Sequence, residues 1–103
     1  MHSNDAQMLV LTVLADGPLH GYAINTAIDR LTGRKLGPGS LYGALSRLEA
    51  RGLIGPSGEA SGSEERHRTM RITDSGRETL RAELEQMAHV SRVGLRALGI
   101  APA

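Results

Sequence analysis

Residues 37–54 read Gly-Pro-Gly-Ser-Leu-Tyr-Gly-Ala-Leu-Ser-Arg-Leu-Glu-Ala-Arg-Gly-Leu-Ile, and this stretch decides the fold of the 103-residue chain. Four apolar residues in it recur at the i, i+3, i+4, i+7 spacing of one helix face: Leu41, Ala44, Leu45 and Leu48. Pro38 suits a first helical turn, where the missing N–H leaves no hydrogen bond unmade. Gly52 is typical of a residue that follows a helix. The stretch therefore predicts a helix over residues 39–51 with one buried aliphatic face.

The opposite face of this predicted helix is small and polar and carries one strong cation. Its members are Gly39, Ser40, Gly43, Ser46, Arg47 and Ala50, with Tyr42 at the flank. Small side chains let a helix approach a groove closely, and Arg47 can reach a guanine edge or a phosphate. Lys35 adds a cation shortly before the helix. A solvated face more often carries Glu and Lys pairs, so the pattern favours a helix that enters the major groove of DNA.

Two more helices are predicted before this one. Residues 4–15 start with Asn4 and Gln7 at capping-box spacing and continue as an apolar run that a Gly-Pro pair ends. In residues 20–32, four apolar residues share the one-face spacing and are expected to point inward: Ile24, Ala27, Ile28 and Leu31. Gly33 then ends the second helix.

The period changes after the third helix. Residues 53–54 are a short apolar pair, residues 57–65 are polar and rich in turn formers, and residues 66–72 alternate. Met70 and Ile72 fall on one side of that alternation, as in a half-buried strand. The expected fold class is therefore mainly α with a small β-hairpin, a winged helix-turn-helix plus a C-terminal dimerisation helix.

A second group of cations lies at the base of the predicted hairpin. Arg66, His67 and Arg68 are placed where a wing holds the minor groove or adjacent phosphates. The tip of the loop holds three glutamates, so we expect the base of the wing, rather than its tip, to touch DNA.

A last helix is predicted from a Thr73 cap to about Leu98. Its apolar residues form two lines, and one small domain can cover only one of them, so a homodimer is expected to bury the other. The expected dimer residues are Leu80, Leu84, Met87, Ser91, Leu95 and Leu98. The domains then divide into residues 1–72, a winged-helix DNA-binding domain with its wing at about 53–72, and residues 73–103, a dimerisation helix with a short tail.

Composition and charge exclude several classes of protein. The formal net charge is +1, but residues 20–72 hold eight Lys and Arg against five Asp and Glu. There is no cysteine, so disulfides, thiolate metal sites and a cysteine nucleophile are ruled out. No apolar run approaches the roughly 20 residues of a membrane span. No His spacing typical of metal sites and no catalytic arrangement occurs, so we expect a cytoplasmic non-enzyme without a cofactor or metal site.

Four segments resemble the PadR-like family of winged-helix transcriptional regulators. Residues 17–24, Gly-Pro-Leu-His-Gly-Tyr-Ala-Ile, resemble its GPLHGYxI segment, and residues 37–45 are similar to SPGTLYPAL. Residues 47–54 resemble RLExxGLI, and residues 71–76 resemble YxLTxxG. The resemblance covers roughly residues 8–80.

The resemblance implies a homodimeric repressor that binds a pseudo-palindromic operator and is released by a small ligand. It also implies that Tyr22, Ser40 and Tyr42 meet the DNA backbone or its vicinity. Two departures concern the site: Gly43 replaces the usual Pro, and Thr69-Met70 replaces two aromatic wing residues. The chain also has no Trp, so a ligand cannot be stacked between tryptophans at the dimer interface as in some relatives.

Two alternative functions stay open. The low net charge and the acidic loop tip suit a winged-helix module that binds proteins without reading an operator. A dimer can also bring distant His and Asp side chains together, which suits a module that senses a metal or a drug. The identity of a small-molecule or metal effector is not fixed by the sequence.

Overall fold

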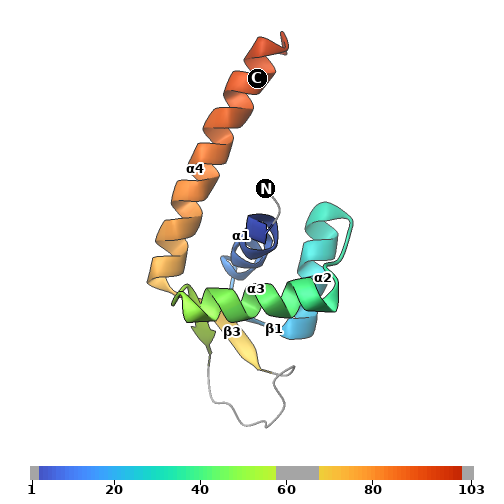
Figure 1. The fold of residues 1–103 in the computed structure, drawn as a ribbon, viewed down its shortest axis with the longest axis vertical. Helices are drawn as coiled ribbons and strands as arrows, with labels where there is room; N and C mark the ends of the chain where they lie inside the picture. The colour runs from blue at the N-terminus through green and yellow to red at the C-terminus, as the bar shows by residue number, and fades with distance from the viewer. Residues whose placement is uncertain (1–2, 58–67, 101–103) are drawn as a thin grey trace.

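The computed structural model describes residues 3–57 and 68–100, with side chains from residue 6 onward. Its elements follow the chain as α1 (Ser3–Leu14), β1 (Leu19–His20), α2 (Gly21–Thr32), α3 (Pro38–Ala50), β2 (Ile54–Pro56), β3 (Thr69–Ile72) and α4 (Asp74–Ala97). Three helices gather beside the small sheet, and α4 extends away from them (Figure 1). We call α1–α3, the sheet and the start of α4 up to Leu80 the head. The predicted mainly helical winged fold is confirmed.

The core of the head is aliphatic. Its buried side chains come from all four helices and two of the strands: Val10, Leu11, Leu14, Ile24, Ile28, Leu41, Ala44, Leu48, Leu53, Ile54, Met70, Ile72 and Leu80. The buried aliphatic face predicted for α3 is confirmed, with Leu45 half-buried at its edge. The inward-pointing apolar face predicted for α2 is wrong at Leu31, which is 55% exposed. This residue borders an open groove between α1 and α2 instead of the core.

The sheet has three antiparallel strands in the order β1-β3-β2. The predicted hairpin corresponds to β2 and β3. Strand β2 extends two residues beyond the predicted pair 53–54, and β3 lies within the predicted residues 66–72 and ends with them. Met70 and Ile72 are buried and Arg71 is exposed, which confirms the predicted alternation. The sequence does not predict β1, a strand of two residues in which Leu19 pairs with Met70. A two-residue strand is too short to show a period.

Helix ends follow local chemistry with one exception. Gly33 ends α2 at a φ of 84°, a left-handed conformation that glycine adopts without strain. The Thr73 hydroxyl accepts a hydrogen bond from the Gly76 N–H at 3.0 Å and so caps α4 as predicted. However, α1 already begins at Ser3, and Gln7 does not complete a capping box. Its side chain is buried between α1 and α3, where it accepts a 2.7 Å hydrogen bond from Arg51.

The first turns of α4 belong to the head, and the rest does not. Leu80 is 5% exposed and lies in the core, and Arg77 donates a 3.3 Å hydrogen bond to the Ala15 carbonyl at the end of α1. From residue 81 onward nearly every residue of α4 is exposed, and we call residues 81–97 the arm. None of the helices in residues 3–57 and 68–100 combines the length and the apolar character that crossing a bilayer requires.

Candidate nucleic-acid interface

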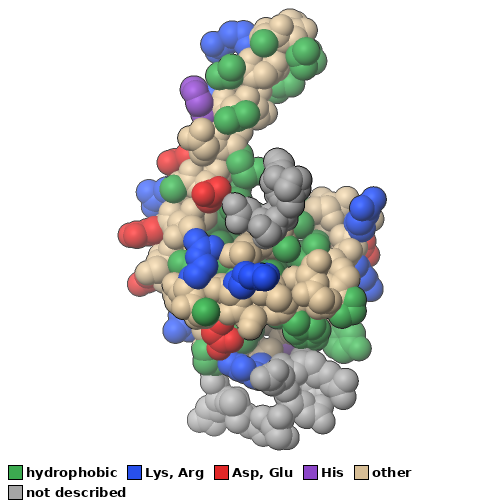
Figure 2. Space-filling view, in the orientation of Figure 1, with side chains coloured by type: hydrophobic (Ala, Val, Ile, Leu, Met, Phe, Trp, Pro, Cys, Tyr) green, Lys and Arg blue, Asp and Glu red, His purple; other side chains and the backbone are tan. Residues whose placement is uncertain are grey.

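Three elements meet around a hollow beside the outer face of α3. The hollow has a volume of about 230 Å³, and the start of α2, the outer face of α3 and the base of the wing line it: Gly21, Tyr42, Leu45, Ser46, Glu49, Arg68 and Met70. The recognition helix and the wing predicted from sequence are therefore adjacent parts of one surface. In the view of Figure 2, basic side chains lie over part of α3, with acidic and apolar side chains beside them.

The outer face of α3 is as slim in the structure as its sequence indicates. Gly39, Ser40, Ser46 and Arg47 are exposed, Gly43 is half-buried, and Tyr42 is 48% exposed at the side nearest the hollow. The aliphatic residues on the opposite side pack in the core, so the outer side of the helix faces away from it.

Arg47 lies along α3 rather than away from it. A β-carbon placed on Gly43, one turn earlier, would lie 3.3 Å from the Nη1 atom of Arg47. The glycine that replaces the family's usual proline therefore leaves room for this guanidinium against the helix backbone. No sequence signal other than the i, i+4 spacing links these two residues.

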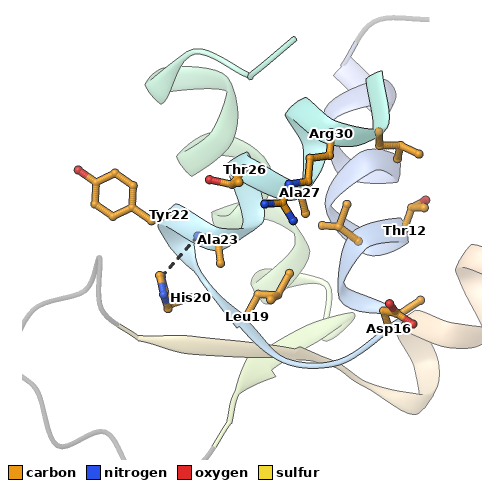
Figure 3. Close-up of a pocket in the computed structure, with 12 residues that line it drawn as sticks. Thr12, Asp16, Leu19, His20, Tyr22, Ala23, Thr26, Ala27 and Arg30 are labelled. Carbon is orange, nitrogen blue, oxygen red and sulfur yellow. Dashed lines mark hydrogen bonds between the residues drawn. The ribbon is translucent and has the colours of Figure 1, made fainter. Parts of the chain in front are cut away.

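Tyr22 stands at the start of α2 and is 68% exposed. It is one of the residues that line the groove between α1 and α2, and its ring lies at the outer side of that groove (Figure 3). The preceding residue, Gly21, lines the hollow, so Tyr22 is at the margin of the same surface as α3 and the wing. His20 caps this end of α2, because its Nδ1 accepts a 3.5 Å hydrogen bond from the Ala23 N–H.

Arg68 connects the wing to α3. Its Nη2 atom lies 3.2 Å from Oε2 of Glu49, and both side chains are partly exposed. The sequence predicts Arg68 as a cation for DNA, and the structure places a carboxylate beside it. Glu49 was not among the predicted site residues. Arg66 and His67, the other predicted wing residues, lie outside the described residues.

The turn between α2 and α3, residues 33–37, presents Lys35 and its neighbour Arg34 to solvent. Asn25 of α2 holds the end of this turn through both halves of its side-chain amide. Its Nδ2 donates to the Leu36 carbonyl at 2.9 Å, and its Oδ1 accepts from the Leu36 N–H at 2.9 Å. The sequence contains no periodic signal for this pairing, since the two residues are eleven positions apart.

Most of the residues predicted for a dimer contact lie on the arm or, in the case of Leu98, directly after it. Leu84, Met87 and Leu98 are 41%, 53% and 76% exposed, Ser91 is exposed, and Leu95 is half-buried. Val90 and Val93, on the second apolar line, are also exposed. Leu80 is a correction to the predicted set, because it packs into the core of its own chain and leaves little surface for a partner.

A second concavity lies between α1 and α2, on the side of the head that carries Leu31 (Figure 3). We call it the α1–α2 groove, and its volume is about 820 Å³. Its walls are mainly apolar, from Val13, Leu19, Ala23, Ala27 and Leu31, and Asp16, His20 and Arg30 add polar groups.

Within residues 3–57 and 68–100, no three His, Asp or Glu side chains are arranged to hold a metal ion.

Known proteins resemble the chain in both sequence and structure. A protein of 37.1 kDa in transposon TN4556 of Streptomyces fradiae is 57% identical over 91 residues, which are 88% of this chain and 25% of that protein. The chain thus spans about a quarter of that relative. A transcriptional regulator from Clostridium thermocellum superposes with a TM-score of 0.74 at 27% identity, covering 88% of this chain and 87% of the regulator.

A PadR-like regulator from Bacillus cereus superposes with a TM-score of 0.75 at 24% identity, over 89% of each chain, which supports the fold. Residues 10–82 match the sequence pattern of the transcriptional regulator PadR-like family. That match contains β1, α2, α3, the wing strands and the start of α4. Because it extends over well more than half of the sequence, this chain belongs to the PadR-like family of transcriptional regulators.

Proposed function

We propose that this PadR-family regulator is a repressor that reads a specific operator by inserting α3 into the major groove. The observation that carries the proposal is the slim outer face of α3 next to the hollow that it shares with the wing. A helix fits the major groove only where its side chains leave room, and here half of the exposed positions of α3 are small: Gly39, Ser40, Ser46 and Ala50. The family membership supports a role in transcription and leaves the direction of control to experiment.

The proposal assigns a role to each predicted contact. Arg47 reaches a guanine edge or a phosphate, while Ser40 and Ser46 approach the groove and Gly39 and Gly43 leave space for it. Tyr22, Lys35 and Tyr42 contact the backbone beside the groove. Arg66, His67 and Arg68 hold the wing on the minor groove or its phosphates. Residues 1–72 thus form the DNA-binding domain, anchored on the first turns of α4.

A homodimer formed through the arm completes the proposal, with residues 73–103 as the dimerisation segment. Leu84, Met87, Val90 and Val93 are exposed on the arm, and a partner that covers them would remove apolar surface from water, which is favourable. Two copies related by a twofold axis would place two α3 helices on half-sites about 34 Å apart. A pseudo-palindromic operator follows from that symmetry.

The test is a fluorescence-anisotropy titration of the duplex that precedes the protein's own coding sequence. A random duplex of equal length and composition serves as the control. We expect tighter binding to the upstream duplex and a steep fall in affinity as salt rises, because phosphate contacts release counterions. Equal affinity for both duplexes would refute operator reading, and no binding at low salt would favour the protein-interaction module instead.

We also propose that the α1–α2 groove receives a small apolar effector. Its volume is within the range typical of ligand pockets, and its floor includes Leu19 and His20 of β1. Because β1 pairs with β3 of the wing, an occupant that displaces β1 also shifts the wing base.

The dye 1-anilinonaphthalene-8-sulfonate serves as an apolar probe of this groove. Ala27→Phe places a large side chain in the groove and should reduce the increase in dye fluorescence on addition of protein. Met87→Ser, on the arm, should leave the part of that increase that comes from dye in the groove unchanged.

A further inference from the structure

The turn between α2 and α3 is fastened at both ends by side chains of α2. At its start, the Thr32 hydroxyl accepts a 3.2 Å hydrogen bond from the Arg34 N–H and lies 2.9 Å from the Arg34 carbonyl. At its end, the Asn25 amide pairs with both the N–H and the carbonyl of Leu36, each at 2.9 Å. Arg34 and Lys35 are exposed between these two fastenings.

Asn25 copies the hydrogen bonding of a β-ladder, with one donor and one acceptor directed at the same residue. Asn25 and Leu36 are both half-buried, so losing the side-chain amide would leave two backbone groups with restricted access to water. Glycines flank the turn at positions 33 and 37, and glycine allows many backbone conformations. A turn of this composition has little intrinsic preference for one shape, so the fixed shape depends on Asn25.

We propose that Asn25 is a positioning residue for DNA recognition: by holding Leu36, it fixes the direction in which Arg34 and Lys35 meet the phosphates flanking α3. This inference rests on the proposed function and adds two statements to it. Arg34 joins Lys35 as a phosphate contact, and a side chain that never touches DNA controls both.

The first experiment removes the clamp. Asn25→Ala is titrated against the upstream duplex and the random duplex at several salt concentrations, beside Thr26→Ala, a control at the exposed neighbouring position of α2. We expect Asn25→Ala to lose about tenfold in affinity for both duplexes, since phosphate contacts act independently of sequence. The slope of log affinity against log salt concentration should become shallower by about one to two. Thr26→Ala should bind like the wild type. Hydrogen exchange of the Leu36 amide should accelerate in Asn25→Ala alone.

The second experiment separates positioning from general stability by a double-mutant cycle. In an Arg34→Ala/Lys35→Ala background, Asn25→Ala should cost less than twofold in DNA affinity, because the groups it positions are gone. A tenfold cost in that background would overturn the proposal and assign Asn25 a purely structural role. Wild-type affinity of a folded Asn25→Ala protein would overturn it as well.

The Arg34→Ala/Lys35→Ala protein alone provides a test that does not depend on Asn25→Ala folding. These two side chains are exposed, so their removal leaves the core untouched, and DNA affinity and salt slope should both fall. Unchanged binding by this variant would overturn the inference while leaving operator reading by α3 intact. Failure of the wild-type protein to bind any duplex would instead refute the proposed function itself.

Discussion

At the scale of single residues, the proposed DNA-binding surface contains two arginines with different surroundings. Arg47 lies on α3 over Gly43, and neither a salt bridge nor a hydrogen bond of its guanidinium is found within the described residues. Arg68 is held by Glu49 at 3.2 Å. Arg47 can therefore contact a base or a phosphate directly, whereas Arg68 must first break its ion pair with Glu49 before it can contact DNA. Their replacements should therefore differ in effect.

Replacing Arg47 with alanine should weaken binding to the upstream duplex roughly ten- to hundredfold, the range expected for a specific arginine contact. The loss should be larger on that duplex than on a random one if the guanidinium reads a base. Anisotropy titrations at fixed salt measure both affinities. Arg81→Ala, a loss of charge on α4 outside the proposed surface, serves as the control, and an equal loss for the two variants would contradict a specific role for Arg47.

Glu49 is expected to restrain DNA affinity. In Glu49→Gln the carboxylate that repels phosphates is removed and Arg68 is released, so binding to random duplexes should tighten by about three- to tenfold. The salt slope should steepen by about one as an extra cation engages a phosphate. The preference for the upstream duplex should shrink in the same titrations. A weaker-binding Glu49→Gln protein would show instead that the ion pair supports the wing in its bound position.

At the scale of elements, α4 contains two glycines in contrasting surroundings. A β-carbon on Gly76 would collide with the Leu53 carbonyl oxygen and the Ile72 side chain, where α4 passes close to the sheet. A β-carbon on Gly94 would meet nothing. The pair allows a comparison of the same substitution at a packed and an open position of one helix.

Gly76→Ala should lower the free energy of unfolding by about 1–3 kcal/mol, because overpacking forces the backbone to shift. Gly94→Ala should leave it unchanged or raise it by about 0.5–1 kcal/mol, since alanine is the better helix former. Urea denaturation followed by circular dichroism measures both. Equal stabilities of the two variants would mean that α4 can move away from the sheet at little cost.

Elements whose apolar residues repeat at a regular spacing were predictable from sequence. Features that depend on a single contact with a distant segment were not. The stripe of α3 and the alternation of β3 emerge from apolar spacing alone. The strand β1 has only two residues, Leu31 falls on the α2 stripe yet lies beyond the reach of the core, and Gln7 has its partner on α3. In each of these cases, the decisive neighbour is set by how the helices pack.

At the scale of the whole molecule, the proposed dimer depends on the arm. Leu84→Glu together with Met87→Glu should convert the proposed dimer into a monomer, because two charges would be buried in an apolar contact. Multi-angle light scattering measures the mass, and DNA affinity should fall more than tenfold as one half-site is lost. Glu78→Lys, at the exposed start of α4, is the control. A dimeric mass for the double variant would place the interface elsewhere.

The candidate site was predictable in its chemistry and less so in its connections. The residue types on the outer face of α3 indicate groove binding without a structure. The Arg68–Glu49 pair and the Asn25 clamp join segments 19 and 11 positions apart, and no local pattern predicts them. Leu80 illustrates the same limit, since sequence cannot tell which apolar line of α4 the head itself covers.

The uninterrupted helical connection between head and arm has a geometric consequence. Leu80 packs in the head and α4 continues as one helix to Ala97, so in the proposed dimer the rotation of each head about the helix axis is fixed by the arm. Inserting one residue after position 80 would rotate one head by about 100° about the helix axis and advance it by about 1.5 Å. If relatives differ in the length of this helix and bind half-sites of the same spacing, we therefore expect the length differences to be close to whole helical turns.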